Sequence, residues 1–285
     1  SAIIFIITRY LPGDVARVIL GREASDASVQ ALRAELGLND PLPLQYATWL
    51  GRFISGDWGQ SYSNGLPIRP LVLDRLGNSL MLALLTVVVA VPLAVTLGVI
   101  AGLNENRWLD HVISVASLAV VGLPEFVTGV LLVEVFAFQL HWLPSSSGIA
   151  PGTGFMQALP SLVLPALTTM LVLLAYVARL TRAGVIEELK AEYVRTAQLK
   201  GLPEHTVIVR HVLRNALLPT ITVVAISLGW LISGLVVVEN VFNYPGLGRL
   251  LIAAIDRRDL PLLQAIGFVT ALGFAFSNLA ADVLY

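Results

Sequence analysis

Residues 79–103 read SLMLALLTVVVAVPLAVTLGVIAGL, and this stretch decides the class of fold. It holds no charged residue and is long enough to cross a hydrocarbon core of about 30 Å, which takes roughly 20 helical residues. An apolar run at 1–8 is expected to be a first spanning helix that is truncated at its N-terminus. Four further stretches have the same apolar character, namely 112–138, 155–178, 215–238 and 260–281. The sequence therefore predicts an all-α polytopic membrane protein with six transmembrane helices.

The composition of the whole chain supports this class. Of its 285 residues 56% are apolar and 13% are charged, and the mean hydropathy is +0.79. Soluble proteins carry about 25% charged residues, so a soluble domain is excluded. The net charge of −1 does not indicate a basic surface that would bind nucleic acid. Cysteine is absent and the four histidines lack metal-binding spacing, so we expect no metal site.

Basic residues in short loops predict the orientation in the membrane. On one side, 179–214 holds seven lysines or arginines and 104–111 holds one. On the other side, 139–154 holds none and 239–259 holds three. The long segment 9–78 is left out because long segments cross largely regardless of charge. The sequence therefore places 179–214 and both termini in the cytoplasm.

The segment 9–78 is expected to be external and helical. Ser25 or Asp26 can cap a helix that stops at Gly37, and a second helix is expected from about Pro43. That second helix carries an aromatic and apolar stripe with helical spacing, made of Tyr46, Trp49, Leu50 and Phe53. Such a stripe indicates packing against the membrane interface or neighbouring helix ends. A tight loop at 56–59 and a short amphipathic helix at 67–76 then lead into the span at 79–103.

Enzyme signatures are missing from the sequence. Neither Lys190 nor Lys200 follows a glycine, so no phosphate-cradling loop is present. The chain also lacks a Gly-x-Ser-x-Gly elbow and a His-Glu-x-x-His motif. We therefore expect a non-catalytic membrane subunit. An intramembrane enzyme is a further hypothesis, which the missing motifs disfavour.

The segment 191–204, AEYVRTAQLKGLPE, is predicted to form a helix, a sharp turn and a second helix. Gly201 suits the left-handed position past a helix end. Pro203 suits the first turn of the next helix, and Glu204 complements its positive N-terminal dipole. On the residues alone, a solvated linker hairpin and a knob gripped by a soluble partner remain equally open.

This segment resembles the cytoplasmic EAA loop of binding-protein-dependent ABC transporter permeases. Arg195, Thr196 and Ala197 stand six residues before Gly201, where the motif has Glu-Ala-Ala. Arg195 replaces the glutamate, Glu192 lies one turn earlier, and Leu218-Pro219 follows five residues later than in the general pattern. Both departures resemble the dipeptide/oligopeptide/nickel branch of the family. Four other stretches resemble the same branch in the same order, namely 11–14, 56–62, 142–144 and 241–251.

The resemblance implies a type I ABC importer permease fold, with 1–285 as a single transmembrane permease domain. It implies that 179–214 is the loop that couples the chain to its ATPase. The coupling residues would be Glu192, Arg195, Thr196, Ala197, Gly201, Leu202 and Pro203. The substrate would be peptides or similar small solutes, and the sequence does not separate dipeptides, longer peptides, glutathione, opines, sugars and nickel complexes.

The resemblance also implies the partners and the location. A second homologous permease, two cytoplasmic ATPase subunits and an external substrate-binding protein would complete the importer. ATP and magnesium would be held by the ATPase subunits, so this chain would bind no cofactor. The location would be the bacterial inner membrane. A secondary transporter driven by a proton gradient, with Glu125 as its relay, is the alternative function.

Two carboxylates fall within the span predicted at 112–138, and intramembrane charges suggest function. Glu125 or Glu134 could attract a substrate amine in the pathway. Each could instead pair with the partner permease or lie at a wetter helix end. Small residues at every fourth position predict close helix packing. They are Gly98 and Gly102 in one span, and Gly267, Ala271 and Ala275 in another.

Overall fold

The computed structural model describes residues 2–9, 15–21, 23–35, 37–149 and 155–284. The stretch 11–14, which carries part of the family resemblance, lies outside the described residues. The chain forms two compact units. Unit 1 comprises Ser1–Ser79 and Pro245–Gly273, and unit 2 comprises Leu80–Tyr244 and Phe274–Tyr285.

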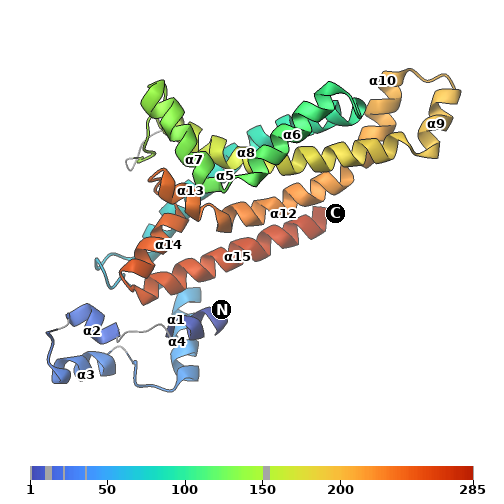
Figure 1. Cartoon of the computed structure of the whole chain (residues 1–285). Coiled ribbons are helices and arrows are strands. Elements are labelled where there is room, and N and C mark those ends of the chain that lie inside the picture. Colours follow the sequence, from blue (N-terminus) through green and yellow to red (C-terminus); the bar gives the residue numbers. More distant parts are fainter. Residues whose placement is uncertain (1, 10–14, 22, 36, 150–154, 285) are drawn as a thin grey trace. The chain divides into compact units, whose positions relative to one another are not determined.

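Unit 1 contains short helices and the first parts of two long ones (Figure 1). The short helices are α1 (Ala2–Arg9), α2 (Val15–Leu20), α3 (Asp26–Glu35), α4 (Leu42–Ser55) and α14 (Leu247–Asp256). The long helices are α5 (Ile68–Leu103) and α15 (Leu260–Leu284), which both continue into unit 2.

Unit 2 contains the remaining helices. Before the hairpin these are α6 (Trp108–Gly122), α7 (Glu125–Val133), the π-helix η1 (Glu134–Gln139) and α8 (Phe155–Leu189). The hairpin region holds α9 (Glu192–Leu199), α10 (Glu204–Val207), the π-helix η2 (Ile208–Val212) and α11 (Leu213–Ala216). The helices α12 (Leu218–Gly234) and α13 (Val236–Val241) follow.

Three helices of the described chain, α5, α8 and α15, are each long and apolar enough to cross a membrane. Two bent pairs, α6 with α7–η1 and α10–α11 with α12, raise the number of candidate spans to five if each pair counts as one. All five overlap stretches predicted as spans, although the pair α10–α11 with α12 begins inside the predicted loop 179–214. Helix α1 lies in the apolar run at the N-terminus. The all-α, multi-pass class predicted from the sequence is therefore confirmed.

The single helix predicted over 112–138 is wrong, because α6 and α7 meet at an angle of 101°. Leu123 is extended, with φ −96° and ψ 133°. The ring of the following Pro124 disfavours a helical conformation at Leu123. Pro124 is then the N-cap of α7. The proline therefore ends one helix and starts another, instead of kinking one continuous helix.

Two predicted borders also differ from the structure. The lead at 67–76 is not a separate helix, because α5 runs without interruption from Ile68 to Leu103. At the other side, α8 continues past the predicted end of its span to Leu189. The first part of 179–214 is therefore a rigid extension of a spanning helix.

The helices of 9–78 form for the expected local reasons. The backbone N–H of Ser28 donates to Ser25 Oγ at 3.2 Å, which caps α3. On α4, the aromatic stripe packs against Phe268 of α15, with ring centroids 5.7 Å from Trp49 and 4.9 Å from Phe53. The interpretation of this stripe as a packing face is confirmed.

Helices α5 and α8 approach so closely in unit 2 that glycine is required between them. A Cβ at Gly98 would lie 2.6 Å from the carbonyl oxygen of Ala178 and 2.6 Å from Thr181 Cβ. A Cβ at Gly102 would lie 2.7 Å from Val185 Cβ, one turn further along. These distances are all shorter than real Cβ contacts, so a side chain at either glycine would clash with α8. We call this close contact between α5 and α8 the seam.

Polar contacts link loops that the charge pattern placed on the same side. Lys190 Nζ lies 3.0 Å from Glu105 Oε1, which joins the segments 104–111 and 179–214. The N–H of Ser147 donates to the carbonyl of Phe242 at 2.7 Å, which joins the loops 139–154 and 239–259. The alternation of sides along the chain therefore agrees with the contacts.

Candidate functional site

In unit 2, α9, the turn 200–203 and α10 form a hairpin. Gly201 has φ +73°, the left-handed conformation that glycine adopts without strain. Pro203 is the N-cap of α10, one position earlier than the first turn predicted for it. The hairpin extends from the end of α8 (Figure 1).

The inner face of the hairpin packs on α8. Val194 and Ala197 of α9 are buried together with Val185 of α8. The cluster is completed by Val207, Val212 and Ala216. A Cβ at Gly184 would lie 2.6 Å from the carbonyl oxygen of Ala216, so α11 touches the α8 backbone. The hairpin is therefore attached to α8 through packed side chains and backbone contact, and not only through the chain that connects them.

Tyr193 of α9 forms hydrogen bonds with residues of both α8 and α11. Its hydroxyl donates to the carboxylate of Glu188 and accepts from Asn215 Nδ2 at 3.1 Å. Burial and the bond to Glu188 raise the pKa of the Tyr193 hydroxyl above its usual value of about 10. The hydroxyl is therefore protonated, and remains a donor, across the physiological range of pH.

Beside Tyr193 the surface is indented by a hollow of about 500 Å³. It is lined by Tyr193, Arg210, His211, Arg214, Asn215 and Leu218. The guanidinium groups of Arg210 and Arg214 are exposed and form no ion pair with the described residues. The hollow therefore presents positive charge to whatever covers it.

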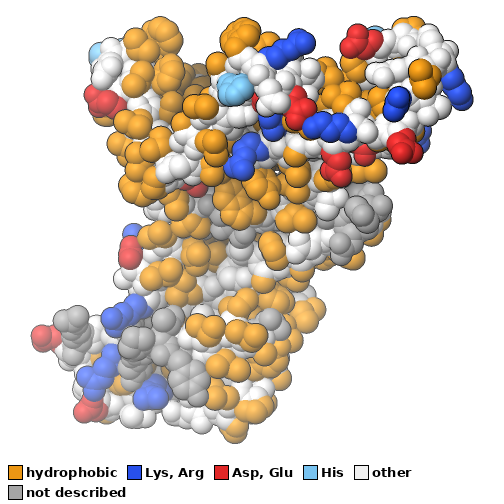
Figure 2. Space-filling model, turned by 45° about the vertical axis from the view of Figure 1, so that its right-hand side comes forward, with side chains coloured by type: hydrophobic (Ala, Val, Ile, Leu, Met, Phe, Trp, Pro, Cys, Tyr) orange, Lys and Arg blue, Asp and Glu red, His pale blue; other side chains and the backbone are white. Residues whose placement is uncertain are grey.

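The residues predicted to couple the chain to an ATPase divide between two faces. Six of them are exposed, namely Glu192, Arg195, Thr196, Gly201, Leu202 and Pro203. Ala197 is 8% exposed and belongs to the inner face, so it supports the hairpin from within. Figure 2 shows charged side chains gathered over this end of unit 2, at the upper right. Sequence reasoning missed Leu199 at the end of α9, an apolar side chain that is 80% exposed.

The base of the hairpin is fixed by an ion pair that sequence reasoning also missed. Arg182 of α8 donates from Nε and Nη2 to the two carboxylate oxygens of Asp110 on α6, with 2.7 Å between Nη2 and Oδ2. The Asp110 side chain is 3% exposed. It also accepts from the N–H of Asn106 at 3.0 Å and from Ser114 Oγ at 3.1 Å. The helix that carries the hairpin is thereby attached to α6.

The two predicted pathway carboxylates lie in different environments. Glu125 opens α7 at the bend, and its Oε1 is buried without a hydrogen-bond partner among the described residues. Thr128 Oγ1, one turn later, is buried and unpartnered in the same way. Glu134 is exposed and accepts from Gln139 Nε2 at 3.3 Å. The structure does not bring Glu125 and Glu134 together on one face.

The small residues of α15 do not share one neighbour. In unit 1 a Cβ at Gly267 would lie 3.3 Å from Ile4 Cγ2 of α1. Ala271 in unit 1 and Ala275 in unit 2 are both exposed. Within the described chain, only the first of the three therefore packs against another helix.

Comparison with known proteins identifies the family. Residues 94–285 match the model of the binding-protein-dependent transport system inner membrane component, and residues 1–83 match the model of its N-terminal region. A probable peptide ABC transporter permease protein, y4tP of Sinorhizobium fredii, is 36% identical over 282 residues, which are 99% of this chain and 90% of that protein. The glutathione transport system permease protein GsiC of Escherichia coli K12 is 36% identical over 285 residues, which are 100% of this chain and 90% of that protein.

A solved structure shares the fold. The crystal structure of an amino acid ABC transporter with histidines matches with a TM-score of 0.58 at 15% identity, covering 75% of this chain and 92% of that one. The chain therefore belongs to the family of binding-protein-dependent transport system inner membrane components, and it is a multi-pass permease subunit of an ABC importer.

Proposed function

We propose that this chain is the translocation subunit of an importer that takes up short peptides from an external substrate-binding protein. The observation that carries the proposal is its similarity, over the full length, to relatives named for peptide and glutathione transport. The similarity does not favour the alternative of a secondary transporter driven by a proton gradient.

The proposed assembly contains a second homologous permease and two ATPase subunits on the cytoplasmic side of a bacterial inner membrane. ATP and magnesium bind to the ATPase subunits, and this chain is non-catalytic. The hairpin of α9 and α10 rests in a groove of one ATPase subunit. Its exposed side chains, among them Arg195 and Leu199, make the contact.

The packing of the hairpin supports a mechanical role. When ATP draws the two ATPase subunits together, the hairpin moves with the subunit that holds it. Val194 and Ala197 press on the end of α8, and the Asp110–Arg182 ion pair carries the same displacement to α6. The Gly98 and Gly102 seam moves α5 together with α8. These helices then turn as one body, which opens the pathway outward until hydrolysis resets it.

Uptake by the reconstituted complex tests this proposal. Proteoliposomes that contain both permeases and both ATPase subunits are supplied with binding protein, ATP and a radiolabelled dipeptide. We expect uptake that requires ATP and the binding protein and that persists when a protonophore collapses the pH gradient. Uptake without the ATPase subunits that stops with the protonophore would support the secondary transporter instead.

A further inference from the structure

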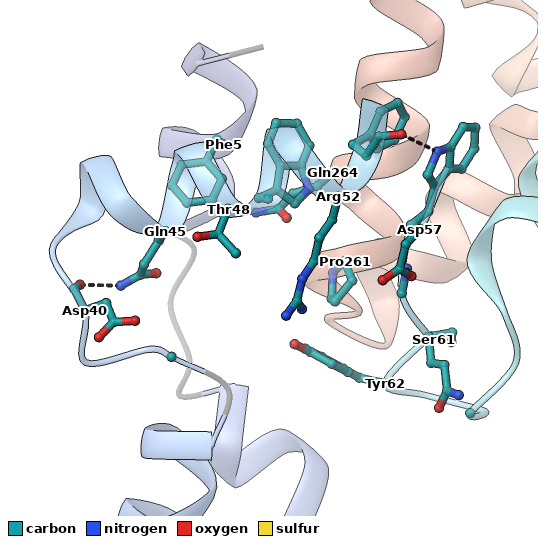
Figure 3. A pocket seen from close by; sticks show the side chains of 17 residues that line it. Phe5, Asp40, Gln45, Thr48, Arg52, Asp57, Ser61, Tyr62, Pro261 and Gln264 are labelled. Atoms are coloured by element: carbon teal, nitrogen blue, oxygen red, sulfur yellow. Dashed lines mark hydrogen bonds between the residues drawn. The ribbon is translucent and has the colours of Figure 1, made fainter. Parts of the chain in front are cut away.

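Unit 1 contains a cavity of about 570 Å³ that the coupling mechanism does not use (Figure 3). Its walls come from α1, the turn 37–40, α4, the loop 56–65 and the first turns of α15. Cavities that bind small molecules measure about 300–1,000 Å³ and combine apolar walls with a few polar groups. This cavity has the same size and the same kind of lining.

The positive group of the cavity is Arg52 of α4. Figure 3 shows its side chain reaching into the open space towards Pro261 and Tyr62. The guanidinium group forms no ion pair and no hydrogen bond with the described residues. Five N–H donors are therefore available at this point, in the fork geometry that suits a carboxylate.

The opposite wall offers acceptors. Gln45 Nε2 donates to the carbonyls of Asp40 at 2.6 Å and Leu38 at 3.2 Å, which fixes the orientation of the amide group. Gln45 Oε1 is buried and has no hydrogen-bond partner among the described residues. The carboxylate of Asp40 lines the same wall and has no ion pair with the described residues. Because Gln45 Oε1 is fully buried, an ammonium group in the cavity would reach the exposed carboxylate of Asp40 and not this oxygen.

The remaining walls are aromatic. Trp58 stacks on Phe53 with ring centroids 4.4 Å apart, and its Nε1 donates to the Phe53 carbonyl at 3.1 Å. Trp49 lies 5.7 Å from Phe5 by ring centroids. The rings are held by these contacts, so they form a fixed apolar surface along the cavity.

We propose that this cavity binds the short peptide itself, as a zwitterion. Arg52 binds its terminal carboxylate, Asp40 binds its terminal ammonium, and the aromatic wall contacts its side chains. The inference rests on the proposed function, because a peptide importer receives its substrate on the predicted external side, where 9–78 lies. The permease thus has a substrate site of its own that is separate from the binding protein.

Modified peptides test this site on the assembled transporter without binding protein or nucleotide. Alanyl-phenylalanine, its C-terminal amide and its N-acetyl derivative are titrated against the purified complex. For the wild type we expect the amide to bind about tenfold more weakly than the free peptide, as for loss of one charge-assisted hydrogen bond. Arg52→Gln should bind both about equally, because the partner of the carboxylate is gone.

Two further variants control the experiment. Arg69→Gln removes an exposed arginine of the same unit that does not line the cavity, and it should keep the wild-type preference. Asp40→Asn should lose the preference for the free peptide over its N-acetyl derivative but keep the preference over the amide. Because Arg52→Gln and Asp40→Asn act on opposite ends of the peptide, misfolding of one variant does not decide the test.

Three outcomes would overturn the inference. The wild type could fail to discriminate between the peptides, or the discrimination could survive Arg52→Gln. Arg52→Gln could also weaken docking of the binding protein and leave peptide binding unchanged, which would make the cavity a protein contact. Uptake by the wild type separates the two proposals: uptake without cavity binding refutes only the site, whereas absence of peptide uptake refutes the proposed function.

Discussion

The guanidinium group of Arg182 on α8 binds both carboxylate oxygens of Asp110 on α6, although the residues lie 72 positions apart in the sequence. Asp110 is almost fully buried, and the Arg182 side chain is 30% exposed. The pair joins two candidate spanning helices, and the proposed mechanism uses it to carry the displacement of the hairpin from α8 to α6.

Asp110→Asn should destabilise the chain by about 3 kcal/mol, because it leaves a partly buried guanidinium group without its counterion. The apparent Tm of the purified complex measures the loss. Glu105→Gln breaks the exposed pair with Lys190 and should cost less than about 1 kcal/mol. Equal shifts in Tm for the two variants would contradict the greater contribution of the Asp110–Arg182 pair to stability.

The seam between α5 and α8 predicts opposite effects for one substitution at two positions. Gly98→Ala should cost about 1–3 kcal/mol, because its Cβ would meet the Ala178 carbonyl oxygen at 2.6 Å. Gly77→Ala on the same helix meets nothing within 4 Å and should stabilise the chain by up to about 1 kcal/mol. Thermal unfolding of both variants checks the prediction, and a stabilising Gly98→Ala would show that the helices are further apart.

Glu125 should matter for transport more than for stability. Glu125→Gln removes a charge whose Oε1 has no partner in the described chain, so the Tm should stay equal or rise. Uptake should fall about tenfold if the carboxylate interacts with the substrate, which corresponds to about 1.4 kcal/mol. The exposed Glu134→Gln is the matched control and should change uptake little. An unchanged rate in Glu125→Gln would exclude the pathway role.

Gly201→Val should uncouple ATP hydrolysis from uptake. A Cβ at Gly201 meets nothing within 4 Å, so the effect comes only from the left-handed backbone, which costs a non-glycine residue about 1–3 kcal/mol. Asn tolerates this conformation, so Gly201→Asn should keep much of the coupling. The ratio of peptide imported to ATP hydrolysed is the readout. Wild-type ratios for Gly201→Val would show that the turn does not need its native shape.

The sequence predicted those features that depend on neighbouring residues. The spans followed from hydropathy, because a helix in lipid must satisfy its own backbone. The hairpin followed from Gly201 and Pro203, because both act through local backbone conformation. The bend of 101° at Pro124 was not predicted, because its angle depends on tertiary packing, such as that of Gly129 against Phe242.

Features built from distant residues could not be predicted in this way. Nothing near Asp110 indicates that Arg182 is its partner. Arg52 and Gln264 both line the cavity of unit 1, and only the fold brings these distant residues into one site. Arg52 lies beside the aromatic stripe of α4. Helical periodicity does not indicate which residues of this helix pack against other helices and which line a cavity.

Contact between the hairpin and an ATPase subunit is the central claim, and cysteine crosslinking measures it directly. The chain has no cysteine, so Leu199→Cys places one thiol on the exposed side chain at the end of α9. Val115→Cys, on the exposed apolar face of α6, is the control. We expect a crosslink from residue 199 to an ATPase subunit in at least one nucleotide state and none from residue 115. Absence of the crosslink from residue 199 with ATP, with ADP and without nucleotide would contradict this claim.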